Sequence, residues 1–415
     1  MKKSLYFLAA SYFGFFARLK LKQWQPRVFV VTGSSGKTTT LHLLQAQFGD
    51  RAHYSHKANS AFGIPFDILG LQRKTFQRIE WLRLIVMAPF AVLTKKYPED
   101  IYIVEVDCDR PHEGEFLAEL LRPEAIIWLS STQTHAKNFD LLVGDQYGTV
   151  EEVIGHEFGN LLAASSKLVI VDADNAVIAS QLVRSHAKKI ELTDEHIGLY
   201  KPGLRSTSFE LDGEECSVPA LLPREVALSV LAVKKLAEYV DIEFDSDFMH
   251  FQLPPGRSSV FAGKKDTTLI DSTYNASLDA AEAMIATFDT LKAEHKWLVI
   301  SDILEQGRSE SAVHERLAKA ISHVKADKII LMGPRTGRYT APKLDELHVQ
   351  YIAVDGPKQV LDIIKRNIKG GETILFKGTR FLEGVVERYL ASPEDASKLC
   401  RRETVWVKRR KKFGI

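Results

Sequence analysis

The chain has 415 residues, of which 45% are hydrophobic, and its 55 Lys and Arg nearly balance its 53 Asp and Glu. This length and composition predict a globular protein of two or three domains, and the net charge of +2 argues against a nucleic-acid binder that works by bulk charge. The three cysteines lie far apart without a C-x-x-C spacing, which excludes a four-thiolate zinc site and indicates a reducing cytoplasm.

The first segment of the chain, residues 1–27, contains an apolar run at 5–16 between basic ends. Such a run superficially resembles a signal peptide, but it is shorter than the roughly 20 residues that a membrane-spanning helix needs. We expect a helix that either packs on the protein or lies on a membrane surface.

Residues 28–42 read VFVVTGSSGKTTTLH and predict a strand, a glycine turn and a helix. The usual pattern G-x-x-x-x-G-K-[ST] would place a glycine at Val31, so the turn is shortened. In such a turn, backbone N–H groups face phosphates, a lysine neutralises charge and a Thr hydroxyl reaches Mg²⁺. We therefore predict ATP and Mg²⁺ as cofactors, the alternative being a turn that merely joins strand to helix. The predicted phosphate-binding residues are Gly33, Ser34, Ser35, Gly36, Lys37, Thr38 and Thr39.

Further strand candidates alternate with helical patterns, which predicts parallel sheets covered on both faces. The turn residues of QLPPGRSS, 252–259, separate two such series and predict a domain boundary. The predicted domains are therefore 28–251 and 252–400, followed by a basic tail at 401–415. The strand candidates are 101–106, 125–130, 167–173, 268–272, 297–302, 328–333 and 373–378, and the clearest helices are 224–239 and 278–293.

The order G-x-x-G-K-T-T-T resembles the loop of the Mur ligases, the ATP-dependent amide ligases of peptidoglycan precursor synthesis. HKANSAFGIP resembles their Asn-rich segment, and IVEVDCDRPHEGEF is similar to the strand that carries the magnesium-binding glutamate, here Glu105. RPEAIIWLSSTQTHAKNF resembles the strand and turn with the metal-site histidine, here His135. The resemblance thus implies Thr38, Glu105 and His135 as the metal site.

The last third of the chain resembles the D-alanyl-D-alanine-adding, or MurF-type, branch of this family. PPGRSS resembles the family's P-G-R junction, which implies that Arg257 swings toward the phosphates. LIDSTYNASLDAAEAM is similar to the branch's I-D-D-x-Y-N-A-N-P-D-S segment, which implies nucleotide contacts from Asn275 and, at the ribose hydroxyls, from Asp271. ISDILEQGRSESAVH and LFKGTRFLEGVVE resemble two further motifs of this branch.

This resemblance implies an α/β fold with a P-loop central domain, built on a mostly parallel sheet, and a C-terminal Rossmann-like α/β domain. It also implies that ATP activates a substrate carboxylate as an acyl phosphate, which the amine of an amino acid or dipeptide then attacks. Lys37, Glu105, His135 and Arg257 are the implied catalytic residues, because this chemistry depends on positioning and on cations. From the residues alone, Glu105 could instead cap a helix, His135 could be a surface histidine and Arg257 a solvated linker charge.

The implied substrate is a cell-wall precursor, either nucleotide-linked or lipid-linked. Two other interpretations stay open: a poly-glutamate or cyanophycin-type ligase of the same superfamily, and a catalytically impaired, nucleotide-binding regulatory relative.

Three departures from the family pattern bear on these expectations. Phe158 stands where most Mur ligases carry a carbamoylated lysine for the second magnesium. Four explanations stay open: His156 or Glu157 substitutes for the lysine, the second metal is held differently, the enzyme is impaired, or the segment is misaligned. LPREVALSVLA, 222–232, lacks the asparagine expected to recognise adenine. Only 27 residues precede the first strand, so the front domain that holds the UDP end in MurF-type enzymes is expected to be missing.

Two apolar stretches, 4–16 and 79–93, and the tail 401–412 with its seven Lys or Arg together predict a surface that touches anionic lipid. The predicted location is the cytoplasm, with this peripheral contact at the inner face of the plasma membrane.

Overall fold

The computed structural model describes residues 3–56, 58–73, 78–133, 135–144, 147–379 and 381–415. The chain forms two compact units. Unit 1 comprises residues 1–196 and 228–245, and unit 2 comprises residues 197–227 and 246–415. The four segments expected from the sequence, with bounds at 27, 251 and 400, remain predictions.

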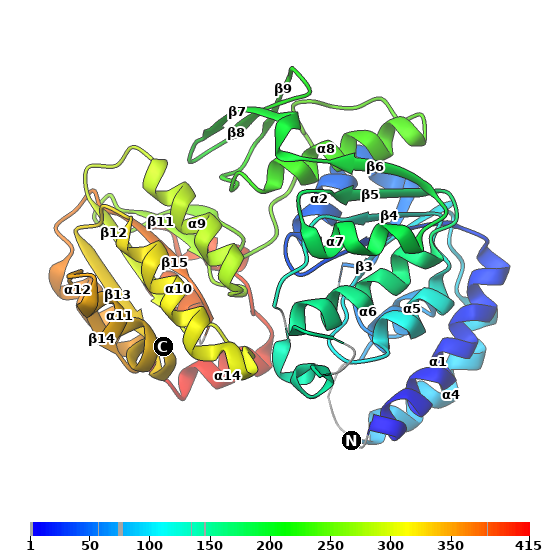
Figure 1. Ribbon diagram of the computed structural model, residues 1–415. Coiled ribbons are helices and arrows are strands. Elements are labelled where there is room, and N and C mark those ends of the chain that lie inside the picture. Colours follow the sequence, from blue (N-terminus) through cyan, green and yellow to red (C-terminus); the bar gives the residue numbers. More distant parts are fainter. Residues whose placement is uncertain (1–2, 57, 74–77, 134, 145–146, 380) are drawn as a thin grey trace. The chain divides into compact units, whose positions relative to one another are not determined.

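Unit 1 is built on a six-stranded sheet in the order β2-β3-β1-β4-β5-β6, in which every neighbouring pair is parallel (Figure 1). The central strands are buried along almost their whole length, which explains their continuous Val and Ile runs. The predicted mostly parallel α/β fold is therefore confirmed. The strands are β1 (Arg27–Thr32), β2 (Ala52–Tyr54), β3 (Ile101–Val106), β4 (Ala125–Trp128), β5 (Leu168–Asp172) and β6 (Lys188–Leu192).

Helices connect these strands and pack around the sheet (Figure 1). They are α1 (Lys3–Trp24), α2 (Lys37–Phe48), α3 (Gly63–Ile68), α4 (Arg78–Thr94), α5 (Glu113–Leu121), α6 (Val150–Ala164), α7 (Ala176–Gln181) and α8 (Val226–Tyr239), the last from Leu228 onward. Short 3₁₀ turns lie at η1 (Gly49–Arg51), η2 (Ala136–Asn138), η3 (Asp140–Leu142), η4 (Leu182–Arg184) and η5 (Asp194–His196).

Unit 2 contains a second six-stranded sheet, in the order β10-β11-β15-β12-β13-β14. β10 pairs antiparallel with β11 and the other pairs are parallel, which confirms the expected C-terminal α/β architecture. The strands are β10 (Ser259–Ala262), β11 (Thr268–Ser272), β12 (Lys296–Ser301), β13 (Lys328–Met332), β14 (Ile352–Val354) and β15 (Thr373–Lys377). The helices are α9 (Leu278–Thr290), η6 (Gly307–Ser309), α10 (Glu310–Ser322), the π-turn η7 (Thr336–Thr340), α11 (Ala341–Glu346), α12 (Pro357–Asn367), α13 (Leu382–Tyr389), η8 (Pro393–Lys398) and α14 (Thr404–Lys411).

A three-stranded antiparallel sheet in unit 2 was not expected from the sequence. It consists of β7 (Ile197–Pro202), β8 (Thr207–Leu211) and β9 (Glu214–Val218). Asp212 and Gly213 join β8 to β9 with φ of 52° and 79°, the left-handed pair that a two-residue hairpin turn requires. An Asp-Gly pair after a strand whose residues alternate between buried and exposed was a hairpin signal that we missed.

The basic C-terminal segment is folded onto unit 2. Arg410 is buried and donates to Glu387 Oε2 at 2.9 Å, and Arg402 donates to both oxygens of the same carboxylate at 2.7 and 3.0 Å. Arg401 pairs with Glu383 at 3.5 Å. Three of the seven basic residues in the expected lipid-binding tail are therefore committed to ion pairs within the protein.

α1 and α4 of unit 1 lie side by side (Figure 1) and are joined by two polar contacts. Pro89 within α4 carries no N–H, so the carbonyl of Ile85, four residues earlier, lacks its helix bond, and the hydroxyl of Tyr12 on α1 donates to it at 2.9 Å. Nζ of Lys20 on α1 donates to the carbonyl of Val92 at 3.1 Å, at the C-terminal end of α4, where the helix dipole favours a cation. Within the described residues, no helix combines the length and the apolar character needed to cross a membrane.

We expect Tyr12→Phe to lower the free energy of unfolding by about 1 kcal/mol, because the carbonyl of Ile85 loses its donor. In a Pro89→Ala background the restored N–H can donate to the same carbonyl, so Tyr12→Phe should cost clearly less. Chemical denaturation of the four proteins measures this coupling, and an equal loss in both backgrounds would contradict the assignment.

Candidate active site

The glycine turn after β1 has backbone angles and close contacts that suit glycine and disfavour other residues. Gly33 has φ of 130°, and a Cβ there would lie 2.7 Å from the carbonyl oxygen of Ser130, on the segment after β4. Gly36 has φ of 76° and precedes Lys37, the first residue of α2. The turn thus presents the N-terminus of α2, whose first N–H groups have no partner within the helix and suit an anion.

Two serines of the turn hold it against the segment that follows β4. The N–H of Ser34 donates to the carbonyl of Ser130 at 3.0 Å, and the N–H of Ser35 donates to the Ser130 hydroxyl at 2.9 Å. The Ser34 hydroxyl in turn accepts from the N–H of Thr132 at 2.8 Å. These contacts position the loop, and the phosphate contacts expected from Ser34 and Ser35 remain predictions.

Lys37 is buried, with only 8% of its side chain exposed. Its Nζ lies 3.0 Å from Asp107 Oδ2 and donates to the carbonyl of Gly33 at 2.5 Å. Burial alone would lower the pKa of Lys37, but the charges of Asp107 and Glu105 raise it above its ordinary value. The lysine therefore stays protonated beside the loop.

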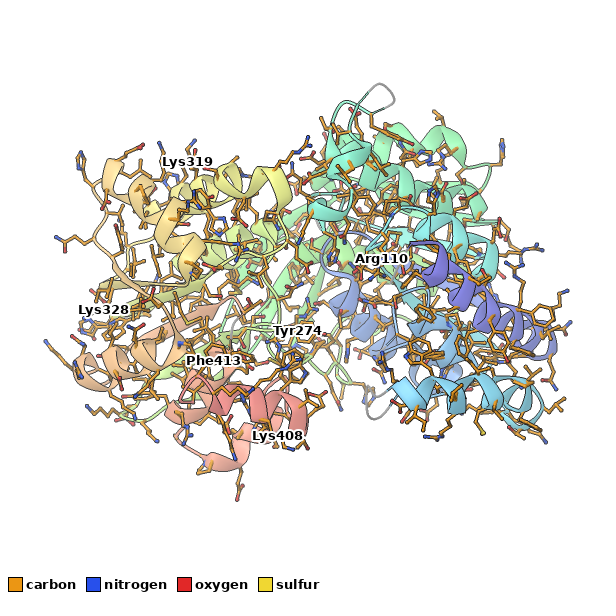
Figure 2. All side chains as sticks on the ribbon, turned by 90° about the horizontal axis from the view of Figure 1, so that it is seen from below. Arg110, Tyr274, Lys319, Lys328, Lys408 and Phe413 are labelled. Atoms are coloured by element: carbon orange, nitrogen blue, oxygen red, sulfur yellow. The ribbon has the colours of Figure 1, made fainter. Side chains whose placement is uncertain are left out.

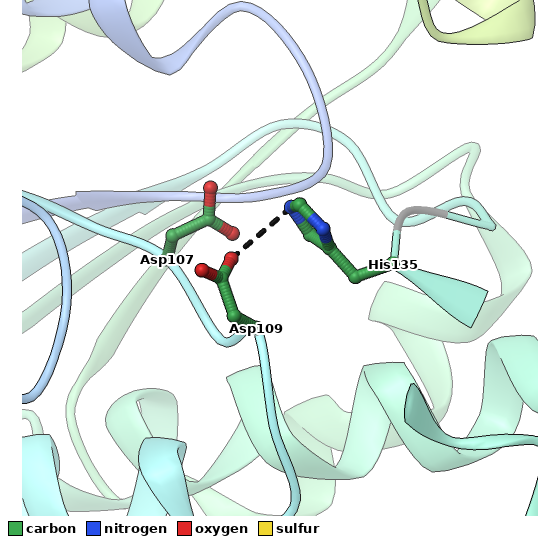
Figure 3. A group of neighbouring side chains, drawn as sticks. All are labelled: Asp107, Asp109 and His135. Carbon is green, nitrogen blue, oxygen red and sulfur yellow. Dashed lines mark ion pairs between the residues drawn. The ribbon is translucent and has the colours of Figure 1, made fainter. Parts of the chain in front are cut away.

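Asp107, Asp109 and His135 form a group of possible metal ligands, whose ligating atoms all lie within 4.8 Å of one another (Figure 3). His135 Nε2 lies 3.1 Å from Asp109 Oδ1. Burial and the charge of Asp107 raise the pKa of Asp109. A bound divalent cation would offset this effect, because it stabilises the charged carboxylate. Two carboxylates and an imidazole fit Mg²⁺ or Mn²⁺, with oxygen as the preferred donor.

The structure thus brings His135 to two carboxylates that the sequence analysis did not single out. Both follow the end of β3, whereas Glu105 is the penultimate residue of that strand, buried, with its N–H donating to the Ser55 hydroxyl at 2.9 Å. The sequence signal that could have identified Asp107 and Asp109 was the D-x-D pattern just past a parallel strand. This pattern places both carboxylates at the carboxyl end of the sheet, where the phosphate loop begins. The metal roles of Glu105 and of Thr38, in the first turn of α2, remain predictions.

In the segment expected to supply a substitute for the carbamoylated lysine, Phe158 and Glu157 contact other groups, and His156 Nδ1 lies 3.4 Å from Arg184 Nη1. Phe158 is fully buried in the core, with its ring 5.9 Å from that of Trp128. Glu157 accepts the N–H groups of His112 and Gly114 at 2.7 and 3.0 Å, and so caps the start of α5. Among the alternatives, this geometry favours a metal that is held differently.

Glu113 ties the metal group to two other segments. Its carboxylate accepts the N–H of Asp109 at 3.1 Å, the N–H of Ala61 in the Asn-rich segment at 2.8 Å and the hydroxyl of Tyr6 on α1 at 3.1 Å. Burial raises the pKa of Glu113 to about 7. These bonds fix the backbone that carries Asp109.

The residues expected from the C-terminal motifs gather in unit 2, at the carboxyl ends of β11 and β15. Asp271 is fully buried, accepts the N–H and hydroxyl of Thr273 at 3.1 and 2.6 Å, and has its pKa raised to about 6 by burial. Lys377 donates to the carbonyl of Asn275 at 3.0 Å, and burial with the nearby charge of Arg257 lowers its pKa to about 7. The nucleotide roles of Arg257, Asp271 and Asn275 remain predictions. Lys377 is a further candidate for such a role. Within the quoted motifs, Lys57, Thr134 and Arg380 lie outside the described residues.

We expect Lys37→Met to abolish measurable nucleotide binding and to lower stability by roughly 3 kcal/mol, because Asp107 is left buried without its cation. The double variant Lys37→Met/Asp107→Asn should regain stability but not binding. Nucleotide titration and chemical denaturation separate the two effects. Lys20→Met removes another buried lysine of unit 1 and should leave nucleotide binding intact; unchanged binding by Lys37→Met would contradict the assignment.

For the metal group, we expect Asp109→Asn and His135→Ala to weaken Mn²⁺ binding by at least about tenfold, because each removes a ligand. Asp174→Asn is a matched control, since Asp172 and Asp174 form the same D-x-D pattern at the end of β5, another strand of the sheet, and are not among the described groups of possible metal ligands. Calorimetric titration gives the affinities. Loss of binding in Glu105→Gln alone would instead support the metal set expected from the sequence.

Comparison with known proteins supports the resemblance. Residues 256–380 match the family model "Mur ligase, glutamate ligase domain". The UDP-N-acetylmuramoyl-tripeptide--D-alanyl-D-alanine ligase of Escherichia coli strain K12 is 24% identical over 343 residues, covering 78% of this chain and 68% of that protein. The protein of the same name from Bacillus subtilis strain 168 is 22% identical over 392 residues, covering 91% and 79%.

Among solved structures, the MurF ligase from Thermotoga maritima in complex with ADP shares the fold, with a TM-score of 0.74 at 20% identity over 94% of this chain and 84% of that one. Residues 256–380 therefore match a Mur ligase domain, and the chain is similar along most of its length to MurF-type ligases.

Proposed function

We propose that the protein is an ATP-dependent, ADP-forming ligase that joins an amino acid or dipeptide to the carboxylate of a cell-wall precursor. The observation that carries this proposal is the buried pair of Lys37 and Asp107, which sets a phosphate-loop lysine directly beside the metal group of Asp107, Asp109 and His135. Phosphoryl transfer needs this combination of cations around one set of oxygens. The relatives named above, which are amide-forming ligases, support the reaction class.

Within this proposal, each residue of unit 1 has a defined task. The N–H groups at the start of α2 and Nζ of Lys37 bind the outer phosphates, and Gly33 lets the loop approach Ser130 closely enough to hold that shape. Asp107, Asp109 and His135 would hold Mg²⁺, which supplies positive charge to the transferring oxygens. Asp107 thus orients the lysine and contributes to the metal site at once.

The substrates follow from the relatives only by class. Their names specify a UDP-linked muramoyl tripeptide and D-alanyl-D-alanine. For this chain we propose a precursor carboxylate, on a nucleotide-linked or lipid-linked carrier, and an amine from an amino acid or dipeptide. Such substrates place the enzyme in the cytoplasm.

A catalytically impaired regulatory relative is the second candidate, and Phe158 is the observation that favours it. The ring lies in the core beside Trp128, and a phenylalanine cannot ligate a metal. If the Asp107, Asp109 and His135 group does not replace the missing ligand, nucleotide binding would survive and turnover would not.

The test is ADP release from purified protein with ATP, Mg²⁺, a panel of muropeptide precursors and a panel of amines that includes D-alanyl-D-alanine and glutamate. We expect release only when acceptor and amine are both present, and none from Lys37→Met/Asp107→Asn. Release with a glutamyl acceptor and glutamate alone would favour the poly-glutamate alternative. Tight ATP binding without turnover in any combination would overturn the ligase proposal and favour the regulatory one.

A further inference from the structure

α1 exposes an apolar stripe on the side opposite its packed side. Leu8, Tyr12, Phe15 and Leu19 follow one another at helical spacing and are exposed, Leu8 by 70%. The packed side of the same helix consists of Ala10, Phe13 and Ala17, which are fully or almost fully buried. Apart from the hydroxyl of Tyr12, which bonds to α4, the exposed stripe therefore does not serve to attach α1 to unit 1.

α4 repeats this arrangement. Its exposed stripe is Ile79, Leu82, Val86, Phe90 and Leu93, again at helical spacing, with Leu93 exposed by 73%, while Leu84, Ala88 and Ala91 are buried. α1 and α4 lie side by side in both views of the molecule (Figures 1 and 2). The two exposed stripes, which we call the α1/α4 face, exceed what single scattered apolar residues on a surface would explain.

The charges that α1, α4 and their flanking residues carry are almost all positive, and Arg18 also pairs with Glu119 of α5 at 3.5 Å. Residues 1–24 and 78–96 contain nine Lys or Arg and a single acidic residue, Glu80. Glu80 is buried, whereas Arg18, Lys22, Arg83 and Lys96 are exposed. An apolar strip flanked by cations complements a surface that is apolar inside and anionic at its edge.

We propose that the α1/α4 face binds the surface of an anionic lipid bilayer, with both helices lying in the interface. Among the described residues, neither helix is both long and apolar enough to cross the bilayer. A second copy of the chain fits this face less well, because two copies would bring the exposed basic residues of each, among them Lys22, Arg83 and Lys96, against those of the other.

Two contacts let the helices act as one rigid surface. The bonds from Tyr12 to the carbonyl of Ile85 and from Lys20 to that of Val92 join them near the middle and at the C-terminal end of α4. Phe13, Leu84 and Ala88 pack in the core of unit 1, so the pair can bind lipid without separating from it. This inference does not depend on the proposed reaction.

Co-sedimentation with vesicles tests the proposal on the full-length protein. We expect binding to phosphatidylcholine vesicles that contain phosphatidylglycerol, little binding to pure phosphatidylcholine, and release as salt rises. Phe15→Glu and Val86→Glu should each weaken binding by about tenfold, and so should Arg83→Glu. The matched controls Leu141→Glu and Val183→Glu change apolar residues of unit 1 that lie outside the face and are more exposed than Phe15 and Val86, and Lys188→Glu changes an exposed lysine outside it; all three should bind as the wild type does.

Nucleotide binding, measured on every variant, shows that the fold is intact and keeps this test separate from the enzymatic one. Absence of binding to anionic vesicles at low salt would overturn the proposal. So would binding that Phe15→Glu and Val86→Glu leave unchanged, since lipid would then touch another surface. A wild-type dimer in analytical ultracentrifugation that these two variants dissociate, without vesicle binding, would assign the face to a second copy instead.

Discussion

The ion pair between Lys37 and Asp107 is the interaction on which the candidate site depends. A buried ammonium group is unfavourable unless a partner compensates for its lost hydration, and the carboxylate at 3.0 Å is that partner. The strand order explains why they meet. β1 lies between β3 and β4, so the loop after β1 emerges with Asp107 on one side and Ser130 on the other. The sheet therefore assembles phosphate loop, metal group and loop anchor at a single edge.

Much of this arrangement could be predicted from sequence, because it depends on local patterns. Every expected strand is present, and β3 and β11 begin and end where the hydrophobic runs do. The glycine turn could also be predicted from the sequence, since its glycines adopt the backbone angles that only this residue favours. What sequence could not supply is the choice among neighbouring carboxylates. Glu105 and Asp107 are two residues apart, and only the position of Lys37 shows which one pairs with it.

The same limit applies to contacts between distant segments. The bond from Tyr12 to Ile85 joins residues 73 positions apart, and no spacing rule connects a tyrosine in one apolar helix with a proline in another. Phe158 shows the reverse case: the motif comparison identified the position in the sequence but not where its side chain lies. Its ring lies in the core because α6 turns that side toward the sheet. The carboxylate of the adjacent Glu157 accepts N–H groups at the N-terminus of α5.

α1 connects the two features of unit 1 that the sequence could not relate to each other. Its exposed stripe belongs to the α1/α4 face, and its Tyr6 hydroxyl reaches Glu113, whose carboxylate holds the N–H of Asp109. A helix needed only to cover the sheet would require neither an outer row of leucine and phenylalanine nor a partly buried polar contact near its start. Each feature carries a cost, since apolar groups exposed to water are unfavourable and a buried carboxylate must be fully bonded. Both are accounted for if one helix anchors the unit to a surface on its outer side and fixes the metal group on its inner side.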